Sequence, residues 1–292
     1  MDQVVVRVGV MLIAVALFVA SVTVLRPVIH RWLGTRLVRE RAAPLPTTWQ
    51  SRVTRQVPVF ARLSGPEQDR LLRSMRDLLT TRTWEGCGGL DLTEDIRITI
   101  AAQACLLTLG LEGDPYPALK TILVYPSTFV PTAPFRWAHG GDDALGAPAL
   151  GESWSNGIIV LAWDSAHIGA AHPADGSNVV LHEFAHQLDG ANGEIDGVPR
   201  MAAQHYGPWA QLFAREFETL VRSADSGHTG ILDTYATTSL PELFAVATET
   251  FFERPLDLRR EHPLLYAALE RYYGQDPIRL MAPGAPSTDT AA

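Results

Sequence analysis

The sequence has few cysteines, and it has no long basic run after its first 41 positions. Cys87 and Cys105 are the two cysteines among 292 residues, and they do not form a Cys-x-x-Cys pair. Two cysteines cannot build a disulfide framework, so we expect reduced thiols in a reducing compartment. The sequence therefore does not belong to the small disulfide-stabilised secreted proteins.

Charge is divided unevenly along the chain. Residues 1–41 carry six Arg against one Asp and one Glu, a net charge of +4. The rest of the chain holds 18 basic and 30 acidic residues, a net charge of −12. An acidic domain without a basic run is a poor nucleic-acid binder, because affinity for phosphate depends on clustered Lys and Arg. We therefore expect no nucleic-acid partner.

An uncharged apolar stretch lies near the N-terminus. It is VGVMLIAVALFVASVTVL, Val8 to Leu25. As a helix, these residues would extend roughly 27 Å, close to the hydrocarbon thickness of a bilayer. Five Arg follow the stretch within the next 16 residues, whereas one Arg and one Asp precede it.

Three interpretations of this stretch compete. A cleaved signal peptide carries its positive charge ahead of the apolar run, which is the wrong side here. A buried helix of a soluble domain is rarely so uniformly apolar. A single membrane-spanning anchor with its arginine-rich flank in the cytoplasm fits best. We therefore predict a transmembrane helix over residues 1–25 and a basic juxtamembrane segment over 26–44, with the remaining chain on the cytoplasmic side of a bacterial inner membrane.

The remaining chain is predicted to fold as one domain over residues 45–280, followed by a disordered tail over 281–292. Short helices outnumber strands and no regular βαβ alternation is visible, so we expect a helix-rich α+β fold with a small sheet. Two strands are expected, one in KTILVYPSTFV and one at Gly157–Trp163, with a loop over Pro131–Ser155 between them. Helices are expected in segments 64–84, 93–110, 179–189, 205–224, 239–255 and 261–277.

The candidate site lies in NVVLHEFAHQLDG, Asn178 to Gly190. On a helix beginning near Val179, the rings of His182 and His186 project from one face, one turn apart, so both can reach one zinc ion. Glu183 lies beside the first ligand and can act as a general base toward water. His-Glu-x-x-His is the metallopeptidase signature, although a helix with two unrelated histidines is the alternative.

A catalytic zinc ion usually has three protein ligands, so a third is expected downstream. A third histidine six residues after the second is excluded, because position 192 is Asn. Asp189 is a weak candidate, which we expect to hydrogen-bond locally or to orient a ligand. At least one of Glu216 and Glu218 is expected on a solvated helix face.

The stronger candidates for the third ligand are Glu242 and Glu249, which lie seven residues apart on one face of an apolar helix. Ser239-x-x-Glu242 is also a capping box, in which the Glu would reach back to a backbone N–H. Glu249 could instead be a carboxylate that contacts a ligand without binding the metal, or one that faces solvent. Spacing favours Glu242 and leaves the choice open.

Two stretches resemble the glucose-regulated metallopeptidases, the family typified by the Mlc titration factor A. They are VVLHEFAHQLDGANGEIDGVP and LDTYATTSLPELFAVATETFFERP, and the likeness extends over roughly residues 45–280. The resemblance implies a zincin-like domain, similar to that of anthrax lethal factor, with His182, His186 and Glu242 binding one zinc ion. It also implies Glu183 as the catalytic carboxylate and Tyr235 as a phenol near the metal that stabilises an oxyanion.

The resemblance further implies aminopeptidase-like cleavage of a peptide or protein substrate, and a transcriptional regulator as a partner. The typical member is soluble, so the apolar N-terminus sets this chain apart. Two alternatives to a peptidase remain, namely a membrane-tethered protein that sequesters a regulator and a zinc site that only stabilises the fold. We also expect strand Gly157–Trp163 to form the edge of the substrate cleft.

Overall fold

The computed structural model describes residues 45–127, 151–154, 157–228 and 230–281. From Leu45 onward the chain forms one compact unit. No helix within these described ranges is long and apolar enough to cross a membrane. The predicted anchor over 1–25 and the juxtamembrane segment over 26–44 lie outside them, as does nearly all of the predicted tail.

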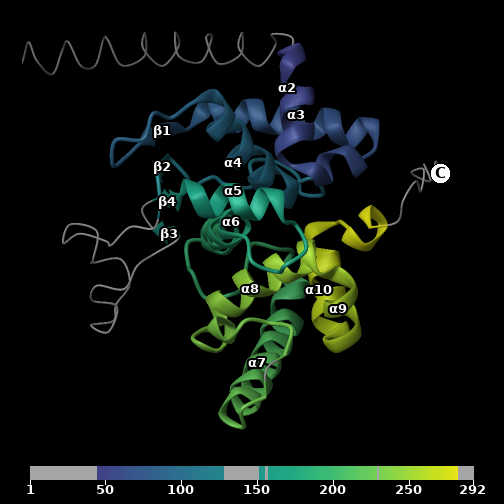
Figure 1. Cartoon of the computed structure of the whole chain (residues 1–292). Coiled ribbons are helices and arrows are strands. Elements are labelled where there is room, and N and C mark those ends of the chain that lie inside the picture. The colour runs from purple at the N-terminus through teal and green to yellow at the C-terminus, as the bar shows by residue number, and fades with distance from the viewer. Residues whose placement is uncertain (1–44, 128–150, 155–156, 229, 282–292) are drawn as a thin grey trace, which may run out of the picture. The chain divides into compact units, whose positions relative to one another are not determined.

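A small mixed sheet lies at one side of the helices (Figure 1). Its strands have the order β1-β2-β4-β3, where β1–β2 and β2–β4 are parallel and β3–β4 is antiparallel. In the central pair, Ile122 lies opposite Ile159 and Val124 opposite Leu161, and all four side chains are fully buried. The bounds are β1 Thr83–Gly86, β2 Thr121–Tyr125, β3 Gly151–Trp154 and β4 Ile158–Ala162.

The sheet differs from the sequence prediction in three respects. β1 begins within the last two residues of the predicted helix 64–84 and continues beyond it, and β3 lies inside the segment predicted as a loop. The strand predicted at Gly157–Trp163 is β4, but it lies between β2 and β3, so its prediction as the edge of a cleft is wrong. β4 is almost wholly apolar and buried, as a strand with neighbours on both sides must be.

Helices make up most of the described chain, which confirms the predicted helix-rich α+β class. The central pair is α6 and α8, which pack directly against one another, while α6 also contacts β3 and β4 (Figure 1). The helices are α2 Thr47–Gln56, α3 Gly65–Thr81, α4 Glu94–Leu107, α5 Trp163–Ala171, α6 Val179–Asp189, α7 Ala203–Asp225, α8 Leu240–Glu253, α9 Pro255–Glu261 and α10 Pro263–Tyr273.

The starts of the central helices follow from their capping residues. The side-chain oxygen of Asn178 accepts hydrogen bonds from the N–H groups of Val180 and Leu181 at 3.1 Å, which begins α6. The hydroxyl of Ser239 accepts from the N–H of Glu242 at 3.3 Å and begins α8. Each cap is made by the residue directly before its helix and fixes where that helix begins. The starting residue in turn fixes the face of the helix on which each later residue lies.

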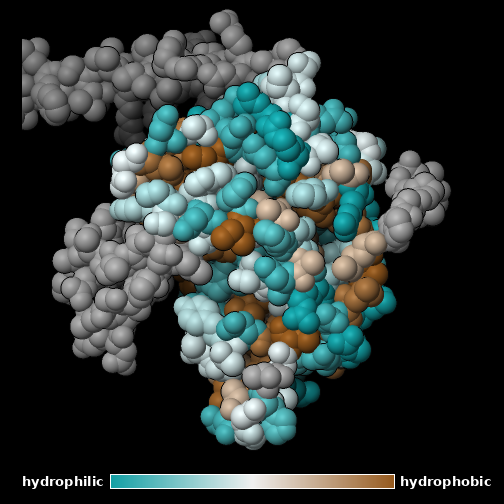
Figure 2. All heavy atoms as spheres, in the orientation of Figure 1, coloured by the Kyte–Doolittle hydropathy of each residue, from teal (hydrophilic) through white to brown (hydrophobic). Residues whose placement is uncertain are grey.

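The surface of this unit carries scattered apolar side chains. On the face drawn in Figure 2, hydrophobic residues appear in separate groups between hydrophilic ones. Among the residues that the structure describes, the large exposed hydrophobic ones are Ile168, Ile195, Tyr235, Leu256, Leu264 and Met281. Of these, Tyr235 bears on the candidate site described below.

Gly157 has to be a glycine for β4 to pair with β2. Its φ is +83°, and a Cβ atom there would lie 2.0 Å from the carbonyl oxygen of Ala118. Gly157→Ala should therefore destabilise the fold by more than about 2 kcal/mol in urea unfolding, through backbone strain and overpacking together. Gly193→Ala is the control, because Gly193 has φ +103° but open space around it, and it should cost about 1 kcal/mol. Equal losses would contradict this account.

Candidate metal centre

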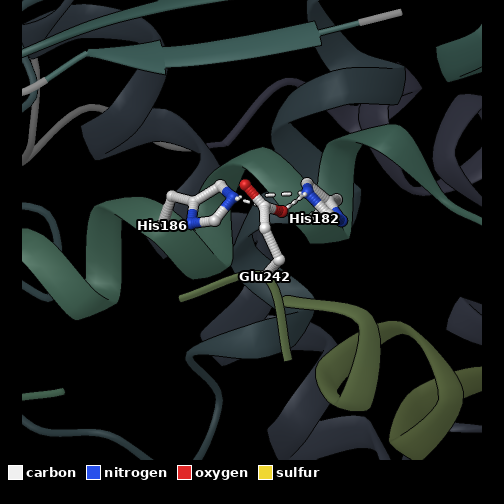
Figure 3. A group of neighbouring side chains, drawn as sticks. All are labelled: His182, His186 and Glu242. Carbon is white, nitrogen blue, oxygen red and sulfur yellow. Dashed lines mark hydrogen bonds and ion pairs between the residues drawn. The ribbon is translucent and has the colours of Figure 1, made fainter. Parts of the chain in front are cut away.

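His182 and His186 project from the same face of α6 toward α8. Their ring centroids lie 4.9 Å apart, and their Nε2 atoms are separated by 3.2 Å. This is the arrangement that a four-residue spacing on a helix produces. Figure 3 shows both rings turned toward the carboxylate that α8 contributes.

That carboxylate belongs to Glu242. Its Oε2 atom lies 3.0 Å from Nε2 of His182 and 3.3 Å from Nε2 of His186. Ser239 caps α8, but the Glu242 side chain is directed to the two imidazoles (Figure 3). The capping-box alternative therefore accounts for the serine and not for the carboxylate.

These three atoms fit a tetrahedral metal site. The ligand atoms of His182, His186 and Glu242 all lie within 4.8 Å of one another. Two ligands of a tetrahedral ion with bonds of roughly 2.0–2.1 Å are themselves about 3.3 Å apart. The three closest separations, 3.0, 3.2 and 3.3 Å, match that edge length. One cation between the three atoms would satisfy all their lone pairs together.

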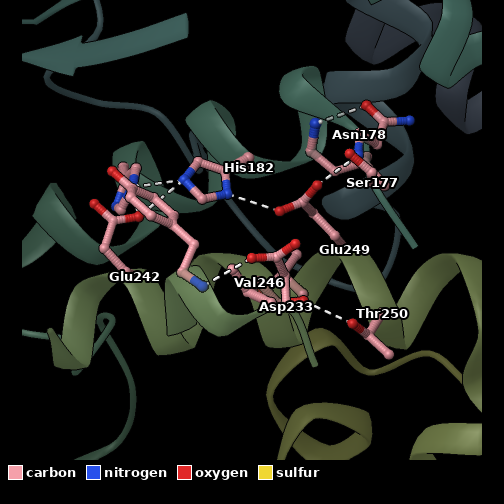
Figure 4. Close-up of polar contacts among 12 residues, drawn as sticks. Ser177, Asn178, His182, Asp233, Glu242, Val246, Glu249 and Thr250 are labelled. Atoms are coloured by element: carbon pink, nitrogen blue, oxygen red, sulfur yellow. Dashed lines mark hydrogen bonds and ion pairs between the residues drawn. The ribbon is translucent and has the colours of Figure 1, made fainter. Parts of the chain in front are cut away.

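Glu249, the other candidate ligand, lies on the opposite side of the His182 ring. Its Oε1 atom is 2.7 Å from Nδ1 of His182, the nitrogen that faces away from the metal group. Figure 4 shows the ring of His182 between Glu242 and Glu249. Glu249 therefore lies outside the group of three atoms that could hold a metal ion, and contacts His182 from the other side of its ring.

The carboxylates around His182 favour a positive charge at the site. Burial lowers the pKa of His182, but hydrogen bonds to Glu242 and Glu249 outweigh it and hold this pKa well above its ordinary value. The charge of Glu183 acts in the same direction. Burial raises the pKa of Glu242, but hydrogen bonds to the two histidines outweigh it and keep this pKa below its ordinary value. A proton and a metal cation would therefore compete for the imidazole of His182.

Glu183 and Tyr235 take different positions around the centre. Glu183 follows His182 on α6 and is buried, with 5% of its surface exposed. Tyr235 lies in the short helix η5, Thr234–Thr237, which contacts α8. Its ring centroid is 5.9 Å from that of His182, and half of the residue is exposed. The phenol thus lies beside the metal group on a side that solvent reaches.

The three remaining acidic candidates lie outside the group formed by His182, His186 and Glu242. Asp189 is fully buried and accepts a hydrogen bond from the N–H of Gly197 at 2.8 Å, and burial raises its pKa to about 6. Glu216 contacts His262 at 2.9 Å. Glu218 is exposed on α7, as expected for one of this pair. None of the three belongs to the metal group.

Sequence reasoning missed a polar network behind the site. The side-chain amide of Asn178 donates to Gln103 of α4 and to Glu253 of α8, both at 2.9 Å. All three residues are buried. Gln103 and Glu253 are polar residues within the strongly apolar helices α4 and α8. A polar residue in such a helix is a sign, visible in the sequence, of a buried hydrogen-bonded group.

Comparison with known proteins gives the family. Residues 30–274 match the sequence model of the glucose-regulated metallo-peptidase M90. The chain belongs to this family. The resemblance inferred from the motifs is thereby confirmed, and the domain is metallopeptidase-like.

Similar proteins cover most of the chain. An uncharacterised protein of Synechocystis is 37% identical over 252 residues, 85% of this chain and 90% of that protein. The Mlc titration factor A of Serratia proteamaculans is 30% identical over 233 residues, 79% of this chain and 87% of that protein. The Mlc titration factor A of Yersinia pestis is 31% identical over 225 residues, 76% and 83% of the two chains.

The geometry predicts a cation site that depends on Glu242. The wild-type protein should retain one zinc ion per chain after dialysis against a weak chelator, whereas His186→Ala and Glu242→Ala should lose it, because each removes a ligand. His262→Ala, which breaks a histidine–carboxylate contact of 2.9 Å outside the metal group, should keep the metal. Metal analysis of the dialysed proteins measures this. Retention of zinc by Glu242→Ala would contradict the assignment.

Proposed function

We propose that this protein is a zinc-dependent peptidase of the aminopeptidase type. The observation that carries the proposal is the convergence of two Nε2 atoms and one carboxylate oxygen, 3.0–3.3 Å apart, beside the buried Glu183. Membership of a metallopeptidase family supports the same activity. The aminopeptidase type is inferred from the family resemblance alone.

The donor set favours zinc among the divalent cations. Two imidazole nitrogens and one carboxylate oxygen are typical of catalytic zinc, whereas magnesium and calcium prefer oxygen ligands throughout. His182, His186 and Glu242 would hold the ion. When bound, it supplies a Lewis acid that acidifies water and polarises a carbonyl group.

The protein's own residues would move the protons. Glu183 would accept a proton from the attacking water and deliver it to the departing amine, as a general base and then a general acid. Its burial strengthens its electrostatic influence, because the surrounding dielectric is low. The phenol of Tyr235 would donate a hydrogen bond to the developing oxyanion. Its position on the exposed side of His182 supports this role.

The edge strand β3 is the place where we propose that an extended peptide binds. Among the described strands β3 is the outermost one on its side of the sheet, pairs with β4 and contacts α6. A strand at a sheet edge offers unpaired backbone groups to an added strand. β4 itself cannot take this role, because it is paired on both sides, with β2 and with β3.

A second candidate function is binding of a transcriptional regulator. It is favoured by relatives named Mlc titration factor A, which are 30–31% identical to this chain. In this alternative a regulator similar to Mlc would be the partner, and the metal would be structural or vestigial. A peptidase requires Glu183 as a general base, whereas binding of a regulator does not.

Glu183→Gln separates peptidase from binding protein. The variant should keep its zinc, because no ligand is removed, and should lose at least about 10²-fold in peptide hydrolysis, because the base is lost. Assays with free and N-terminally blocked peptides, together with metal analysis, measure both effects. Unchanged turnover by Glu183→Gln would refute the peptidase. Equal capture of an Mlc-type regulator by wild type and variant, without hydrolysis by either, would support the alternative.

We also propose that residues 1–25 anchor the protein in the bacterial inner membrane, with the metallopeptidase-like domain in the cytoplasm. The uncharged run and the arginines that follow it support this topology. Deletion of residues 1–25 should move the protein from the membrane pellet to the soluble fraction, with zinc still bound. Because residues 26–41 can adhere weakly to anionic lipid, fractionation includes a high-salt wash. A deletion variant that stays in the salt-washed pellet would exclude the anchor.

A further inference from the structure

We propose that Glu249 is a positioning residue that fixes the orientation and tautomer of His182 for metal binding. The inference rests on the proposed metal centre and assigns a role to a residue outside the ligand set. Glu249 lies on α8 two turns beyond Glu242, and its carboxylate contacts His182 directly. One helix thus provides both a ligand and the group that holds another ligand.

The two oxygens of Glu249 have separate partners. Oε1 lies 2.7 Å from Nδ1 of His182, and Oε2 accepts a hydrogen bond from the backbone N–H of Asn178 at 2.5 Å. Asn178 is the N-cap of α6, the helix that carries His182 (Figure 4). The carboxylate therefore ties the imidazole to the beginning of its own helix. Because Glu249 is 7% exposed, water does not compete strongly for these contacts.

This contact determines which nitrogen of His182 can bind a metal. An ionised carboxylate only accepts hydrogen bonds, so Nδ1 must carry the proton. In the neutral ring, Nε2 then keeps its lone pair, and Nε2 is the atom that faces Glu242 and His186. A hydrogen-bonded carboxylate also makes the imidazole a stronger ligand.

The second histidine is held differently. Nδ1 of His186 is buried and makes no hydrogen bond within the described part of the chain. Within these residues, α8 contacts the His186 ring at Nε2, through Glu242, whereas it contacts the His182 ring at both nitrogens, through Glu242 and through Glu249. Removal of Glu249 should weaken the site at His182.

Glu253 provides a matched control on the same helix. It lies one turn beyond Glu249, is also buried, and also contacts Asn178, through the side-chain amide at 2.9 Å. Its second oxygen accepts from the N–H of Gly176 at 3.0 Å. Glu253→Gln therefore perturbs the same cap and the same core as Glu249→Gln without changing the partner of His182.

The experiment compares zinc affinity in the full-length protein, measured by competition with a chromophoric chelator. Glu249→Gln should bind zinc about 10–100-fold more weakly than wild type, as is usual when the hydrogen-bond partner of a metal ligand is lost. An amide has a single acceptor oxygen, so it cannot serve both His182 and Asn178. Glu253→Gln should bind zinc as wild type does. Far-ultraviolet circular dichroism of each variant establishes that it is folded.

A second measurement uses the wild-type protein and does not depend on a variant folding. Nitrogen-15 NMR of the zinc-loaded protein should show His182 with Nδ1 protonated. A His182 ring with an unprotonated Nδ1, zinc affinity of Glu249→Gln equal to wild type, or an equal loss in Glu253→Gln would each overturn the inference. Failure of wild type to bind zinc would instead overturn the metal centre itself, and the positioning role with it.

Discussion

The contact between α6 and α8 is the constraint on which the site depends. α6 carries two imidazoles on the face turned to α8, and α8 carries Glu242 and Glu249 on the face turned to α6. Buried polar groups without partners are costly, so the two helices can pack closely only where these groups meet. The candidate metal group is therefore part of the interface between these two helices.

The part of the site that is local in sequence could be predicted from the sequence. A spacing of four residues places His182 and His186 on one face of any helix, and the Asn178 cap sets where that helix begins. The choice between Glu242 and Glu249 could not be made by spacing, because both lie on the same face of α8. Only the displacement of α8 along α6 decides which carboxylate meets Nε2 and which meets Nδ1, and that displacement is a property of tertiary packing.

The sheet was the least predictable part, for a physical reason. Its strands have four or five residues each, so their pairing partners rather than their own propensities define them. β1 is a short continuation after α3 that becomes a strand because β2 lies beside it. β4 did carry a usable signal, since an almost unbroken apolar run is typical of a strand with neighbours on both sides and argues against an edge.

The polar residues of the interior also explain why α4, α6 and α8 meet in one register. Asn178 joins Gln103 of α4 to Glu253 of α8, and its backbone N–H is bound by Glu249. If α8 slipped by one turn, Glu242 would leave the imidazoles, and Glu253 would leave the side-chain amide of Asn178. An apolar interface alone would tolerate such a slip far better, because neighbouring turns of an apolar helix are similar. The buried carboxylates thus specify the register that brings the three atoms of the candidate metal group together.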